Sequence, residues 1–102
     1  MIKKLFSLVA AITVLTLING VAFAASPFFE GKTVRIIVGL SAGGGYDLWA
    51  RAIARHYGRH IPGNPTVIVE NMPGAGGQIA ANYIYKAAKP DGLNIGHISG
   101  GI

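Results

Sequence analysis

The chain has 102 residues, a formal net charge of +5 and no cysteine. This length allows one small domain, and the lack of cysteine excludes a disulfide-bonded scaffold. The basic residues are few and scattered, which argues against a nucleic-acid-binding protein.

The N-terminal residues have the pattern of a secretory signal peptide. Lys3 and Lys4 precede an apolar run from Leu5 to Ile18, which is followed by a small-residue cleavage site. A membrane-spanning helix is the alternative, but the apolar run is shorter than the ~20 residues that a span needs. We therefore expect residues 1–24 to be a cleaved signal peptide and residues 25–102 to be an exported domain.

The first element of that domain is a predicted strand from Lys32 to Leu40. It is rich in β-branched residues and has an apolar run from Ile36 to Val38, as strands of a buried parallel sheet do. A glycine-rich loop, GLSAGGGYD, follows directly. Glycines at a strand-to-helix turn let a ligand approach backbone N–H groups closely.

A helix is predicted from Gly45 to His60 because the apolar period changes to that of a helix. Asp47 lies in its first turn, where it can pair with Arg51 four residues later. We expect the outer face to carry Asp47, Arg51, Arg55 and Arg59. The face expected to be buried carries Tyr46, Trp49, Ala50, Ile53, Tyr57 and Ile61.

The remaining elements repeat this alternation. A turn at Pro62–Pro65 leads to a second strand, Thr66–Glu70, and then to a second glycine loop, NMPGAGG from Asn71. A helix over Gly77–Ala88, a turn at Lys89–Gly92 and a third strand over Leu93–Ser99 follow. The inward face of the second helix is expected to carry Ile79, Ala80, Tyr83, Ile84 and Ala87.

The order β-α-β-α-β predicts an α/β fold with a parallel sheet and right-handed connections. In such sheets, ligands bind at the carboxyl ends of the strands, near a switch in strand order. The two glycine loops and a third one at Gly100 and Gly101 all follow strands. We therefore expect them to share one rim of the sheet.

The loops fit a carboxylate better than a phosphate. A P-loop counted from Gly39 would need lysine where Gly45 stands, and a dinucleotide fingerprint counted from Gly74 ends on Ile79 instead of glycine or alanine. A carboxylate needs only two or three converging N–H groups at a helix start. The alternative for each loop is that glycine merely permits a tight turn.

The residues resemble the N-terminal part of the Bug/TctC-type proteins, the extracytoplasmic solute receptors of tripartite tricarboxylate transporters. The matching features are a strand followed by Gly43, Gly44 and Asp47, then Ala50-Arg51, then VENMPGAGG, and finally KPDG before a strand. They extend over nearly all of the chain beyond residue 24.

This resemblance implies a periplasmic-binding-protein fold of type II, in which two α/β lobes close on a small carboxylated solute. It also implies a monomer that delivers the solute to membrane transporter subunits, without a cofactor or metal. The ligand-binding residues that it implies are Ser41, Ala42, Gly43, Gly44, Gly45, Asp47, Gly74, Ala75, Gly76, Gly77, Ser99 and Gly100.

Two departures from the family pattern matter. Many members have proline and an aromatic residue at the entry to the first loop, where this chain has Gly39 and Leu40, so the identity of the solute stays open. Members are also considerably longer. The resemblance therefore implies a fragment, with the second lobe and the rest of the first lobe absent. We expect this fragment by itself to be marginally stable or unfolded, and to bind solute weakly or not at all, because only one side of the cleft is present.

Other candidate residues have simpler roles. His56 and His60 lie four apart on the first helix, as a metal pair can, but Tyr57 stands where a glutamate would follow and no third ligand is evident. His97 is expected to pack within a strand. No nucleophile–base pair and no paired carboxylates are evident, so we do not expect an enzyme.

The leading prediction is a solute-binding receptor fragment for a small carboxylate. The alternatives are an exported nucleotide-binding enzyme lobe of α/β fold and a truncated product without function.

Overall fold

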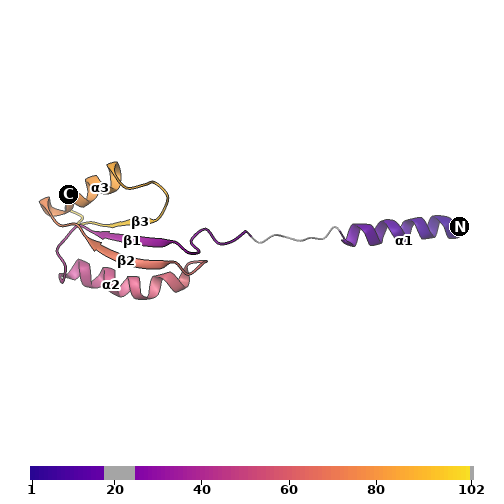
Figure 1. Cartoon of the computed structure of the whole chain (residues 1–102), viewed down its shortest axis with the longest axis horizontal. Helices are drawn as coiled ribbons and strands as arrows, with labels where there is room; N and C mark the ends of the chain where they lie inside the picture. Colours follow the sequence, from indigo (N-terminus) through magenta and orange to yellow (C-terminus); the bar gives the residue numbers. More distant parts are fainter. Residues whose placement is uncertain (18–24, 102) are drawn as a thin grey trace.

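The structure is a computed structural model that describes residues 1–17 and 25–101. Helix α1 covers Ile2–Leu17, within the predicted signal peptide. Figure 1 shows it away from the α/β unit, and its side chains Leu5 and Phe6 are exposed. None of the helices in the described ranges is long and apolar enough to cross a membrane. The expected cleavage site after residue 24 lies outside those ranges.

Three parallel strands in the order β2-β1-β3 form the sheet. The strands are β1 (Thr33–Val38), β2 (Thr66–Asn71) and β3 (Asn94–His97). The connections between them are α2 (Gly45–Tyr57) with the short 3-10 helix η1 (Gly58–His60), and the 3-10 helix η2 (Ala75–Gly77) with α3 (Gln78–Lys86). The predicted β-α-β-α-β order and the parallel sheet are confirmed. This small α/β architecture is consistent with part of a periplasmic-binding-type lobe.

The two connecting helices cover opposite faces of the sheet (Figure 1). Ile36 packs with Ala50 of α2, whereas its neighbour Arg35 contacts Tyr83 of α3. Successive side chains of a strand point to opposite faces, so the two helices lie on different sides. The chain therefore leaves β1 toward β2 on one face and returns past β1 to β3 on the other. This places a switch in strand order at the carboxyl end of β1.

The core is small and centres on β1. On the α2 side, the buried residues Ile36, Val38 and Ala50 form a cluster, with Leu40, Ala54, Val67 and Val69 packed around it. On the α3 side, Ile37 and Ala80 are fully buried. The continuous apolar run of β1 is thus explained by a strand that is covered on both faces.

The predicted inner face of α2 is largely wrong: of its residues, Ala50 is buried and Ile61, just beyond the helix, is half-buried. Trp49 is 70% exposed, and Ile53 and Tyr57 are 46% and 41% exposed, whereas Asp47, which we expected outside, is only 2% exposed. The helix instead turns its small side chains toward the sheet, so that it can approach β1 and β2 closely. Hydrogen bonds to the Asp47 carboxylate hold it in this orientation, as the next subsection describes.

The prediction for α3 is correct in part. Ala80 is buried, and Tyr83 and Ile84 are half-buried as expected. Ile79 is 50% exposed instead, and Ala87 is exposed as well. A Cβ at Gly74 would lie 2.4 Å from Cδ1 of Ile79, which shows that this side chain covers the second glycine loop rather than the sheet.

Candidate functional site

The three loops that follow the strands meet at one rim of the sheet. The N–H of Gly39 donates to the carbonyl of His97 at 3.1 Å, and the N–H of Met72 donates to the carbonyl of Val38 at 2.8 Å. A Cβ at Gly39 would lie only 3.1 Å from Cα of Gly77. The expected convergence of the loops is therefore present, and close packing between backbones produces it.

The first loop leads into the start of α2, where backbone donors lack partners. Gly44 is the N-cap residue and provides no side-chain cap. Within the described part of the chain, the N–H groups of Gly44, Gly45 and Tyr46 form no hydrogen bond. Such donors, together with the positive end of the helix dipole, favour an anion.

The glycines of this loop differ in what they require. Gly43 has φ of +86°, a conformation that side chains other than glycine rarely adopt. Gly44 has φ of −78° and Gly45 is helical, so both have backbone conformations that other residues adopt readily. An added Cβ would lie no closer than 3.6 Å to another atom at Gly44, and would meet nothing within 4 Å at Gly45. Neither backbone conformation nor crowding therefore explains why glycine stands at 44 and 45.

Asp47 is the central polar group beneath the first loop. Its Oδ2 accepts hydrogen bonds from the N–H of Gly43 at 2.8 Å and from Nε of Arg51 at 2.9 Å, and its Oδ1 accepts one from Nδ2 of Asn71 at 2.9 Å. The Arg51 guanidinium, the Gly43 N–H and the Asn71 amide hold the pKa of the Asp47 carboxyl well below its usual range. The predicted Asp47–Arg51 pair is confirmed.

The second loop is built from four consecutive residues with positive φ: Gly74, Ala75, Gly76 and Gly77. A Cβ at Gly76 would meet open space, and Ala75 and Gly76 are exposed. Gly77 is buried, and a Cβ there would lie 3.2 Å from Cγ2 of Ile98. The outer half of this loop thus faces solvent, whereas Gly77 packs between the other two loops.

The third loop contributes Ser99, which is half-buried, and Gly100, which is exposed. Next to it, the rings of Tyr46 and His97 lie 5.0 Å apart at 70°, an edge-to-face contact that joins the first turn of α2 to the end of β3. His97 therefore packs, and it does so at the rim.

The structure places the candidate residues at different depths. Ser41 to Gly45 are exposed at the rim, as are Ala75, Gly76 and Gly100. Asp47 and Gly77 lie beneath the surface as supports. Because the Asp47 carboxylate is paired with a guanidinium, it does not make the rim anionic.

Sequence reasoning missed Asn71 and a second polar network. The Arg35 guanidinium donates to both carboxylate oxygens of Glu70, through Nε at 2.8 Å to Oε1 and through Nη2 to Oε2, and its Nη1 donates to the Tyr83 hydroxyl at 3.2 Å. This network lowers the pKa of Glu70 and joins β1, β2 and α3. The motif VENMPGAGG contains Glu70 and Asn71 and was the only signal for either residue.

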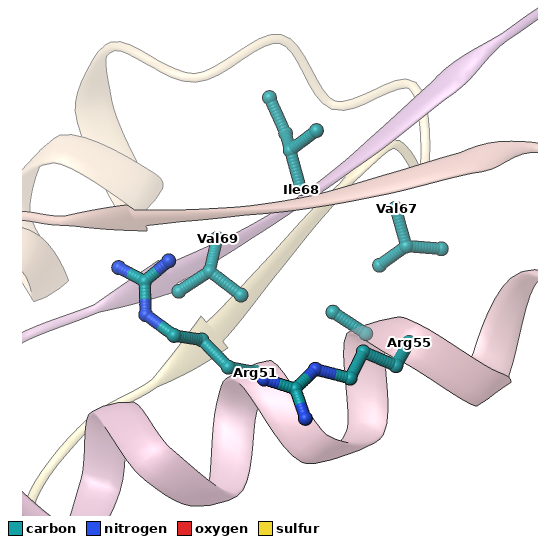
Figure 2. A pocket seen from close by; sticks show the side chains of 6 residues that line it. Arg51, Arg55, Val67, Ile68 and Val69 are labelled. Carbon is teal, nitrogen blue, oxygen red and sulfur yellow. The ribbon is translucent and has the colours of Figure 1, made fainter.

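A hollow lies away from the glycine loops, beside the edge strand β2. It has a volume of about 390 Å³ and is lined by Arg51, Ala54, Arg55, Val67, Ile68 and Val69. Figure 2 shows the arginines of α2 lying along this strand. One of them, Arg51, is already bound to Asp47 and Asn71.

The metal-pair alternative gains no support from the histidines. Nδ1 of His56 lies within hydrogen-bonding distance of Nη2 of Arg59, and both side chains are exposed. In residues 1–17 and 25–101, no three histidine, cysteine or acidic side chains are grouped as metal ligands.

Comparison with known proteins agrees with the resemblance to the Bug family. No family model matches the chain. A UPF0065 protein of Cupriavidus necator is 38% identical over 71 residues, which are 70% of this chain and 21% of that protein. A UPF0065 protein of Bordetella pertussis is 36% identical over 92 residues, which are 90% of this chain. A UPF0065 protein of Bordetella bronchiseptica is 33% identical over 67 residues, which are 66% of this chain.

The relatives are thus named UPF0065 proteins, which correspond to the Bug family and its TctC-like members. The chain spans 21%, 28% and 19% of their respective lengths. What the complete proteins bind and deliver is therefore a matter of proposal for this chain.

Proposed function

We propose that the chain forms a solute-binding lobe of an extracytoplasmic receptor for a small carboxylated solute. The observation that carries this proposal is the start of α2. There Gly44 and Gly45 leave room above three unpaired N–H groups, and neither glycine is required by the backbone.

Two or three N–H groups at the positive end of a helix suffice to bind a carboxylate. Ser41 can add a hydroxyl donor, and the exposed backbone of Ala75 and Gly76 faces solvent at the same rim. The Asp47 charge is offset by Arg51, so it does not repel an incoming anion. The resulting site is small and takes one carboxylate group.

The proposed role is binding without covalent chemistry. Asp47 is engaged by three donors and is held ionised, which makes it a poor proton acceptor. A nucleotide-binding enzyme lobe is less well supported, because Gly45 stands where a P-loop has the lysine that reaches the phosphates.

The family resemblance extends the proposal to the cellular role. Residues 1–24 act as a signal peptide, and the exported receptor is a periplasmic monomer. The loaded receptor presents its solute to the membrane subunits of a tripartite tricarboxylate-type transporter. Closure of two lobes around the solute would provide the signal for delivery.

The test is a titration of the ¹⁵N-labelled full chain with citrate, succinate and glutamate, followed by NMR. We expect the amide signals of Gly44, Gly45 and Tyr46 to shift, because their N–H groups would donate to the carboxylate. Succinamide is the matched control, since it has the shape of succinate without its charge. Shifts with inorganic phosphate and none with the carboxylates, or equal shifts with succinamide, would contradict the proposal.

A further inference from the structure

The side chain of Asn71 occupies a junction between the two glycine loops. Asn71 is the last residue of β2 and lies opposite Val38, the last residue of β1. Its Nδ2 donates to the carbonyl of Leu40 at 3.1 Å and to Oδ1 of Asp47 at 2.9 Å. Its Oδ1 accepts from Nη2 of Arg51 at 3.1 Å. One amide thus binds the entry of the first loop and the first two turns of α2.

The contacts continue from Asn71 to the glycines. Asp47, oriented by Asn71 and Arg51, accepts the N–H of Gly43 at 2.8 Å. Gly43 therefore points its donor inward, at a position where φ is +86°. The N–H groups that follow, those of Gly44, Gly45 and Tyr46, have no partner among the described residues.

We propose that Asn71 is a positioning residue that sets the direction of the first glycine loop, so that the donors after Gly43 face the solute. This inference rests on the proposed function for the identity of the solute. Asn71 itself does not touch the solute; it acts through Asp47 and Leu40. The second glycine loop, which begins just after Asn71, is thereby fixed relative to the first.

An amide is suited to this place because it offers donors and an acceptor together. A carboxylate at position 71 could still accept from Arg51, but it would offer no donor to Leu40 and would lie beside the carboxylate of Asp47. Like charges at hydrogen-bonding distance repel and raise a carboxyl pKa. Asn71→Asp should therefore disturb the loop more than Asn71→Ala.

The test compares Asn71→Ala with Asn82→Ala in the full chain. Asn82 is an exposed asparagine of α3 and serves as the matched control. Two readouts are taken: the affinity for succinate from the shifts of Gly44 and Gly45, and the hydrogen exchange of the Gly43 amide relative to that of Ile36 in β1. For Asn71→Ala we expect affinity to fall by about tenfold or more, because the side chain loses its three hydrogen bonds to Leu40, Asp47 and Arg51.

We also expect the Gly43 amide of Asn71→Ala to exchange much faster while the Ile36 amide changes little. The control Asn82→Ala should leave both readouts unchanged. A purely structural role would instead accelerate exchange at Gly43 and Ile36 together, with no separate loss of affinity, and would overturn the inference. Unchanged exchange at Gly43 would overturn it as well.

An exchange of the two side chains adds a rescue. Asn71→Asp alone should weaken succinate binding most, and adding Asp47→Asn should recover part of the affinity, because one carboxylate and one amide again face each other. No recovery would contradict the proposed pairing. If the unsubstituted chain binds no succinate, the proposed function fails, whereas exchange at Gly43 still decides the role of Asn71.

Discussion

Substituting Gly45 with alanine should separate stability from binding. Gly45 is the first residue of α2, and a Cβ placed there meets no atom within 4 Å. Glycine in a helix interior is less favourable than alanine by about 1 kcal/mol. In the first turn we expect about half of this, so Gly45→Ala should raise the free energy of unfolding by about 0.5 kcal/mol.

This gain corresponds to an increase in Tm of about 2–4 °C for a domain of this size. Binding should change in the opposite direction. The Cα–Cβ bond of a helical residue tilts toward the helix N-terminus, so the new methyl group would lie where a carboxylate approaches the N–H groups of Gly44 and Gly45. We expect the affinity for succinate to fall about tenfold, which corresponds to about 1.4 kcal/mol.

Thermal unfolding followed by circular dichroism gives the first quantity, and the NMR titration with succinate gives the second. Gly92→Ala is the control with the reverse pattern. Gly92 has φ of +78° in a turn with open space around it, so alanine there should lower stability without changing affinity. An unchanged affinity for Gly45→Ala would refute the assignment of this helix start as the binding site, and a lower Tm would refute the expected gain in helix stability.

Three further results are expected. The only tryptophan, Trp49, is 70% exposed, so its fluorescence emission should be red-shifted and readily quenched by acrylamide. A blue-shifted emission that acrylamide does not quench would mean that this face of α2 is covered. The pKa of Asp47 is lowered on folding, so its carboxylate stabilises the fold above the unfolded pKa of 3.8, and this contribution is lost as the pH falls through the folded pKa. In urea unfolding at a series of acidic pH values, Asp47→Asn should therefore lose less stability with falling pH than the unsubstituted chain. The same pH profile for both chains would argue against the Asp47 network. A Cβ at Gly58 would lie 2.4 Å from the carbonyl oxygen of Pro65, so Gly58→Ala should cost about 1–3 kcal/mol in urea unfolding, and a neutral effect would show that η1 can move away from β2.

The elements and their order could be predicted from local patterns. The run Ile36–Val38 is β-branched and apolar because β1 is covered on both faces, and the glycines after it mark the turn into α2. The parallel direction of the strands then predicts that the three loops share one rim, because the carboxyl ends of parallel strands lie at the same edge of the sheet. These features depend on neighbouring residues or on general rules of topology, so one sequence suffices.

The orientation of α2 could not be predicted in this way. Periodicity favours the side with the largest apolar residues, here Trp49 and Tyr57, whereas the sheet is contacted by Ala50 and Ala54 because small residues allow close approach. The burial of Asp47 depends on a hydrogen bond from Asn71, 24 positions away in the sequence. No local pattern indicates a contact of that range, which is why the polar support of the loops was missed.

The strand order β2-β1-β3 also has a consequence for the order in which the sheet can be assembled. The central strand comes first in the chain, and β2 and then β3 each join a free side of it. No strand has to be inserted between two that are already paired. Each new β-α unit can therefore be added to the existing sheet as the chain emerges.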